Sequence, residues 1–158
     1  MCSNICAIVT VMFLALSVGM VAAVQAQGQI PKEELQRFQC TWVLIAAEMD
    51  GKKVDEADVK KSRMTLVGDK IEVTTPHQHK DKIVASLTKL DLTKNPKEIQ
   101  WVRTAGPKAG TTLTAIYEFE GPDRFKICFD PSGLIIPKEF GTKAGSGHIL
   151  HIWRRVNW

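Results

Sequence analysis

The stretch from Gly110 to Pro131 constrains the fold more than any other part of the sequence. It reads GTTLTAIYEFEGPDRFKICFDP, with apolar and polar side chains alternating on both sides of Gly121-Pro122-Asp123. Such alternation indicates strands with one buried face, and a short Gly/Pro/Asp break between two strands indicates a hairpin. Only Ile116 and Cys128 break the polar parity. The apolar parity consists of Leu113, Ala115, Tyr117, Phe119, Phe125, Ile127 and Phe129.

Further strands are predicted on both sides of this hairpin. Residues 31–38 are expected to form a short helix, because Pro31 suits a first turn and the acidic residues precede Arg37. The long segment from Ser132 to Gly147 is a loop in which Leu134-Ile135-Ile136 and Phe140 are expected to be partly buried. The remaining strands are predicted at residues 41–49, 64–67, 70–75, 82–92, 98–104 and 148–156.

The eight strands are joined mostly by short turns, which favours an antiparallel meander. A meander of this size removes its exposed edges when the first strand pairs with the last. We therefore predict an all-β fold, an eight-stranded antiparallel up-and-down barrel of the lipocalin-like kind with a short N-terminal helix.

The N-terminal residues predict export. Ile5 to Val24 is almost entirely apolar, contains no Asp, Glu, Lys or Arg, and ends in Val24-Gln25-Ala26. This pattern is typical of a secretory signal peptide, here residues 1–26, cleaved near Ala26. The mature protein would reach the periplasm, the cell envelope or the extracellular space as a single domain, residues 27–158. The alternative is an uncleaved membrane anchor, which would be the chain's only contact with a membrane.

The charges argue against nucleic acid as a partner. The chain has 21 basic and 17 acidic residues, a net charge of +4, and the two signs are well mixed. Such mixing is typical of a solvated surface, and we expect a monomer. His77 and His79 form a His-x-His pair, but zinc usually needs three or four protein ligands, so neither a metal nor a cofactor is predicted. No nucleophile and base can be placed together, so the sequence does not predict an enzyme.

Several motifs resemble those of a family of small exported lipocalin-like domains of unknown function, found chiefly in planctomycete bacteria. The resemblance covers essentially the whole mature chain. It implies a barrel and export, and it implies no catalytic residues. The matching segments are Phe38-Gln39-Cys40-Thr41-Trp42, Asp50-Gly51-Lys52, Asn95-Pro96-Lys97, Ala115-Ile116-Tyr117-Glu118, Ile127-Cys128-Phe129, Pro137-Lys138-Glu139-Phe140 and Gly145-Ser146-Gly147-His148.

One departure from the family concerns Cys40, which stands where the family has glycine. Because Cys128 matches the family's strand cysteine, Cys40 is a candidate for its disulfide partner. Cys128 has the outward parity, so the bond would pin the 31–38 helix over the outer wall. The alternative is two separate small apolar side chains.

The resemblance also implies a structural pair at one end of the barrel. Trp42 on the first strand and Arg154 on the last resemble the Trp–Arg pair that closes lipocalin barrels, in which a guanidinium stacks on an indole. Arg155 is the alternative partner, because periodicity does not settle which parity of the last strand faces inward.

The interior is the candidate functional site. An eight-stranded barrel has room for side chains or for one small ligand. We hypothesise a small apolar ligand, with the Tyr117 hydroxyl as the best polar contact. The alternative is a side-chain-filled barrel that serves as a structural or protein-interaction module of the cell envelope. The candidate cavity residues are Trp42, Leu44, Trp101, Leu113, Tyr117, Phe119, Phe125 and Phe129.

Overall fold

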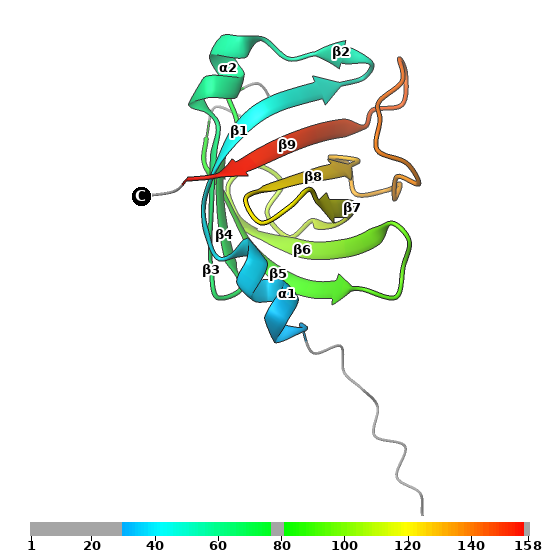
Figure 1. The fold of residues 1–158 in the computed structure, drawn as a ribbon. Helices are drawn as coiled ribbons and strands as arrows, with labels where there is room; N and C mark the ends of the chain where they lie inside the picture. The colour runs from blue at the N-terminus through cyan, green and yellow to red at the C-terminus, as the bar shows by residue number, and fades with distance from the viewer. Residues whose placement is uncertain (1–29, 77–80, 157–158) are drawn as a thin grey trace, which may run out of the picture.

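The computed structural model describes residues 30–76 and 81–156, and their strands form one antiparallel sheet closed into a barrel (Figure 1). The sheet order is β2-β1-β3-β4-β5-β6-β7-β8-β9, and β1 also pairs with β9. The predicted eight-stranded barrel, with its first strand beside its last, is therefore confirmed. The strands are β1 (Cys40–Met49), β2 (Lys52–Lys53), β3 (Arg63–Val67), β4 (Lys70–Thr74), β5 (Ile83–Asp91), β6 (Lys97–Ala105), β7 (Thr112–Phe119), β8 (Arg124–Phe129) and β9 (Ile149–Arg155).

Strand β1 makes closure possible because it pairs on both sides. Its first half pairs with β3, from Cys40 opposite Leu66 to Val43 opposite Arg63. From Trp42 to Met49 it pairs with β9, with an irregularity between Leu44 and Ala46. An irregularity of this kind bends a strand and increases its twist. The two-residue β2, which the sequence did not predict, extends only the far end of β1.

Two short helices accompany the barrel. Helix α1 (Lys32–Phe38) confirms the predicted N-terminal helix, and α2 (Glu56–Lys61) begins at Asp55, whose Oδ1 accepts a hydrogen bond from the Ala57 N–H at 2.7 Å. Such a cap satisfies one of the free N–H groups of the first turn. In the described part of the chain, neither helix has the length and apolar character needed to cross a bilayer.

Helix α1 closes one end of the barrel and does not cover the outer wall, so the predicted location over Cys128 is wrong. Phe38, at its last turn, is buried against Tyr117 and Phe125, with ring centroids 5.2 and 5.3 Å apart. The following residue, Gln39, bonds to the backbone of Gly68 in the β3–β4 turn. The helix therefore inserts its aromatic side chain among the inward-facing residues of the strands.

The long loop between β8 and β9 covers part of the outer wall instead. The Cys128 thiol donates to the carbonyl of Gly141 at 3.6 Å, and the Lys126 ammonium lies 4.4 Å from the Phe140 ring. Ile116, opposite Cys128, is 2% exposed although it faces outward. The loop that packs over β8 thus explains the outward apolar side chain of Cys128, and Ile116 is buried beside it on the same face.

The expectation that this loop is partly buried is confirmed for Phe140, which is half-buried, and is wrong for Leu134-Ile135-Ile136. These side chains are 86%, 56% and 45% exposed. The backbone of this turn is fixed by Asp130, whose Oδ2 accepts hydrogen bonds from the N–H groups of Leu134 and Ile135, at 3.2 and 3.0 Å.

Candidate ligand-binding cavity

The α1 end of the barrel is closed by a Trp–Arg pair, but the arginine is Arg155 and not Arg154. The Arg155 guanidinium lies 4.8 Å from the Trp42 ring and donates to the carbonyls of Gln39 (3.2 Å) and Arg37. Arg154 is exposed, because the inward parity of β9 is that of Ile149 and Trp153. The indole N–H of Trp42 donates to the Phe38 carbonyl at 2.8 Å, so strand and helix are joined here.

The Tyr117 hydroxyl belongs to this closed end and not to the cavity. It donates to Glu34 of α1 at 3.0 Å, and the same carboxylate accepts from Lys97 at 2.9 Å and Arg37 at 3.2 Å. Burial alone would raise the pKa of Glu34, but the hydrogen bonds from Lys97, Tyr117 and Arg37 lower it below the usual value. Burial, together with the Glu34 charge, raises the pKa of Tyr117. The hydroxyl is therefore already satisfied by the protein.

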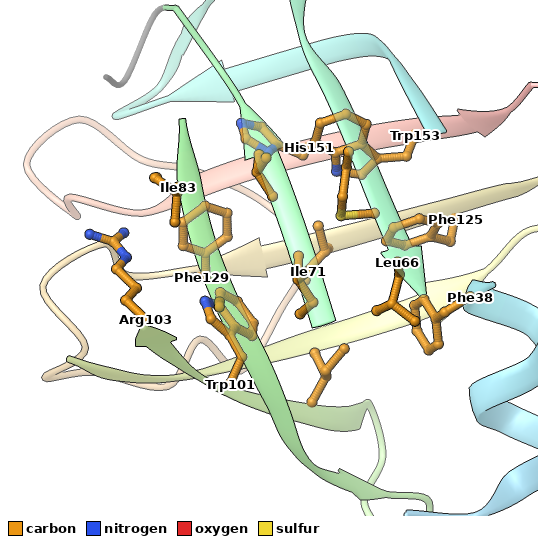
Figure 2. Close-up of a pocket in the computed structure, with 15 residues that line it drawn as sticks. Phe38, Leu66, Ile71, Ile83, Trp101, Arg103, Phe125, Phe129, His151 and Trp153 are labelled. Carbon is orange, nitrogen blue, oxygen red and sulfur yellow. The ribbon is translucent and has the colours of Figure 1, made fainter. Parts of the chain in front are cut away.

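Next to this closed end, the barrel interior holds a cavity of about 80 Å³ (Figure 2). Of the predicted cavity residues, Trp101, Phe125 and Phe129 line it. Trp42, Leu44, Leu113 and Tyr117 are buried in the packed core, and Phe119 packs beside Phe38. The structure thus lies between the two expected interiors, since aromatic side chains fill one end and leave a space in the rest. The lining is Phe38, Met64, Leu66, Ile71, Val73, Ile83, Ala85, Ile99, Trp101, Arg103, Phe125, Ile127, Phe129, His151 and Trp153.

Four rings form a continuous arc in the cavity wall. Trp101 meets Phe129 at 5.8 Å between ring centroids, Phe129 meets His151 at 5.5 Å, and His151 meets Trp153 at 5.5 Å. Each pair is close to edge-to-face, the geometry that aromatic rings prefer. His151 and Trp153 were not predicted to line the interior. The signal was present in β9, whose inward parity follows once the strand is paired with Trp42.

Arg103 is the charged residue that sequence reasoning missed. Its side chain lines the cavity and is 3% exposed. One terminal nitrogen, Nη1, donates to the Pro107 carbonyl at 3.3 Å, whereas within residues 30–76 and 81–156 Nε has no hydrogen-bond partner. Burial lowers the pKa of the guanidinium. Arg103 shares its parity with Ile99 and Trp101, and this pattern could have placed it inside the barrel.

The backbone around Arg103 is held in place by neighbouring strands. The residue opposite it on β5 is Ala85, whose small side chain leaves room for the guanidinium stem. The loop that supplies the Pro107 carbonyl contains Gly106, with φ +87°. A Cβ there would lie 2.6 Å from the Lys82 carbonyl oxygen, so glycine permits this close approach of the loop to β5.

The predicted Cys40–Cys128 disulfide is absent, and both thiols are free. Cys40 packs against the interior core with Trp42, whereas Cys128 faces the outer loop and contacts Gly141. The two side chains lie on opposite faces of the barrel wall, which explains why they do not pair. Burial raises the pKa of each thiol, which disfavours the reactive thiolate.

The structure also bears on the remaining candidates. Among the described residues, no group of three or more His, Cys, Asp and Glu side chains is placed to hold a metal ion. The His77 and His79 pair lies outside the described residues.

Comparisons with known proteins do not add a family. No family model, no curated protein and no solved structure matches this chain. The resemblance to the planctomycete lipocalin-like domains therefore stays a prediction, and function has to be argued from the cavity itself.

Proposed function

We propose that this protein binds a small apolar molecule inside its barrel. The observation that carries the proposal is the cavity, which is lined by aliphatic and aromatic side chains apart from Arg103 and His151. Protein interiors are close-packed, and voids larger than a water molecule are few in any domain. Apolar voids of this general size remain dry and take up small apolar molecules.

The size of the cavity restricts the ligand. Drug-sized pockets usually enclose about 300–1,000 Å³, whereas this one has about 80 Å³. A cavity needs about 10–15 Å³ of this volume to hold one water molecule. The space therefore corresponds to on the order of five to eight water-sized positions, which suits a ligand with a chain of a few carbon atoms.

Thermal unfolding with and without 1-hexanol tests the proposal. A ligand that binds only the folded state stabilises it by about 2.7 kcal/mol at one hundred times its Kd, which corresponds to a rise of several degrees in Tm. Ala85→Leu, which places a larger side chain in the cavity, should reduce this rise. Ala46→Leu, at an exposed position of β1, is the matched control. An unchanged Tm of the wild-type protein at saturating 1-hexanol would refute binding of an uncharged apolar ligand.

Export completes the proposal. The apolar segment from Ile5 to Val24 and the small-residue exit at Ala26 support a cleaved signal peptide and a monomer that works outside the cytoplasm. We assign binding and not catalysis, since the raised pKa of the Cys40 and Cys128 thiols makes them poor nucleophiles. N-terminal sequencing of protein recovered from its host should begin close to Gln27.

A second candidate function, an interaction module of the cell envelope, is supported by the exposed Leu134-Ile135-Ile136. All three side chains are exposed, and hydrogen bonds to Asp130 fix the backbone at Leu134 and Ile135. Replacing all three by serine should abolish retention of the protein on isolated cell envelopes if they form a contact surface, and should leave the alcohol-induced Tm rise unchanged. Equal retention of both proteins would reject this candidate.

A further inference from the structure

The buried guanidinium of Arg103 is the feature of the cavity that the apolar lining does not explain. A guanidinium has five N–H donors and stays protonated in proteins. Arg103 is only 3% exposed. Its one hydrogen bond to a described residue joins Nη1 to the Pro107 carbonyl. Burying a charge without a partner of opposite sign is costly. A destabilising buried charge of this kind is expected where the charged group takes part in function.

The described residues around Arg103 supply no counter-charge. Among the described lining residues of the cavity none is acidic, and no ion pair between described residues includes Arg103. Its Nε lacks a partner within the described ranges. By contrast, the other buried charge of the interior, Glu34, has three donors around it. The positive charge at the cavity is therefore not balanced by any of the described residues.

The position of Arg103 relative to the apolar wall defines the shape of a partner. Figure 2 shows Arg103 at one edge of the lining residues and Phe38 at the opposite edge, with Ile71 and Phe129 between them. One end of the space thus offers N–H donors and a positive charge, and the remainder offers carbon. A ligand that matches both is an amphiphile with a negatively charged head and a short apolar tail.

We propose that the ligand of this cavity is a short-chain monocarboxylate, with its carboxylate on Arg103 and its alkyl chain directed toward Phe38. The inference rests on the proposed function, and it names the class of ligand. A carboxylate can accept from Nε–H and from a terminal N–H of the same guanidinium, an arrangement that is geometrically specific. One guanidinium balances one negative charge, which favours a monocarboxylate over a phosphate.

Arg103 also has a structural contact, and this contact does not account for the site. The bond to Pro107 holds the β6–β7 loop and uses a single N–H group. A purely structural arginine would be expected to have its Nε satisfied as well, because buried donors are nearly always paired. The unpartnered Nε is the atom to which the carboxylate is assigned.

The test compares head groups on one tail. At neutral pH, isothermal titration of the full mature protein with hexanoate, 1-hexanol and hexylammonium should rank hexanoate first, about tenfold or more tighter than hexanol, and hexylammonium last. Arg103→Met keeps an unbranched apolar stem and should remove the preference for hexanoate. Arg154→Met, at the exposed neighbour of the closing arginine, should keep the wild-type ranking.

Each outcome decides between the two proposals. Equal binding of hexanoate and hexanol to the wild-type protein overturns the carboxylate inference and leaves the apolar binding function intact. An unchanged preference in Arg103→Met also overturns it. Failure of both compounds to bind rejects the proposed function itself. Should Arg103→Met not fold, the head-group ranking in the wild-type protein still decides the inference.

Discussion

Glu34 joins the N-terminal helix to the barrel through one carboxylate. It is 6% exposed and accepts hydrogen bonds from Lys97 of β6, Tyr117 of β7 and Arg37 of its own helix. Charged hydrogen bonds of this kind are stronger than neutral ones. The sequence shows Glu34 only as an acidic residue in the first turn of a helix, so its role depends on contacts far away in the chain.

Replacing this carboxylate should weaken the fold and change its acid sensitivity. We expect Glu34→Gln to lower the free energy of unfolding at pH 7 by about 1–3 kcal/mol. The folded-state pKa of Glu34 lies below the unfolded value of 4.5. The folded state therefore binds fewer protons, and this stabilisation is complete above the unfolded pKa and is lost as the pH falls through the folded pKa.

Urea unfolding of both proteins between pH 7 and pH 3 measures this effect. The difference between wild type and Glu34→Gln should shrink as the pH falls below about 4.5. Glu33→Gln, at the exposed neighbouring position, serves as the control and should show neither change. A difference that is constant over the whole pH range would contradict the assigned role of the charge.

The closing arginine allows a comparison between adjacent residues. Arg155→Lys keeps the charge but loses the planar group that stacks on Trp42 and donates to two carbonyls. We expect a loss of about 1–3 kcal/mol in the free energy of unfolding. Arg154→Lys should change it by less than about 0.5 kcal/mol, as is usual for surface positions. Equal effects in urea unfolding would mean that Arg155 does not close the barrel.

At the scale of elements, α1 closes one end of the barrel. Its residues predict a helix, but the sequence does not state which part of the barrel the helix contacts. The position of the helix is set by contacts between Phe38 and aromatic rings on β7 and β8. These rings are separated from the helix by about half of the sequence. The same limit applies to the β8–β9 loop, whose contact with Cys128 no local pattern reveals.

Removing the Phe38 ring of α1 should both destabilise the barrel and enlarge its cavity. Phe38→Ala is expected to cost about 3–5 kcal/mol, the usual loss for a buried phenylalanine. Because Phe38 lines the cavity, the variant should also accept longer alcohols than the wild-type protein does. Chemical denaturation and titration with 1-octanol measure the two effects. Gln36→Ala, at an exposed position of the same helix, should leave both unchanged.

At the scale of the whole molecule, the barrel was predictable and the site was predictable only in part. Alternation of apolar residues identifies the strands, and the need to remove sheet edges identifies the closure between β1 and β9. Trp101, Phe125 and Phe129 followed from the same alternation. Arg103 has the same parity as Ile99 and Trp101, but it was not predicted to line the cavity because charged side chains are normally found on the solvent face.

The size of the barrel cavity could not be predicted from the sequence either. Whether Tyr117 fills the interior or surrounds a ligand depends on how α1 packs against it, through Phe38 and Glu34. Such packing is decided by tertiary contacts. The structure combines the two interiors that the sequence left open, since a largely packed core encloses a cavity of about 80 Å³.

The measurement that tests the central claim most directly is a methyl NMR titration of isotope-labelled protein with hexanoate. The account predicts saturable shifts for the interior methyl groups of Ile71, Ile83, Ile99 and Ile127, which line the cavity. It predicts no change for Ile45 and Ile152, which lie against the outer groove beside α2. Shifts confined to the outer residues, or none at saturating hexanoate and 1-hexanol, would contradict the account.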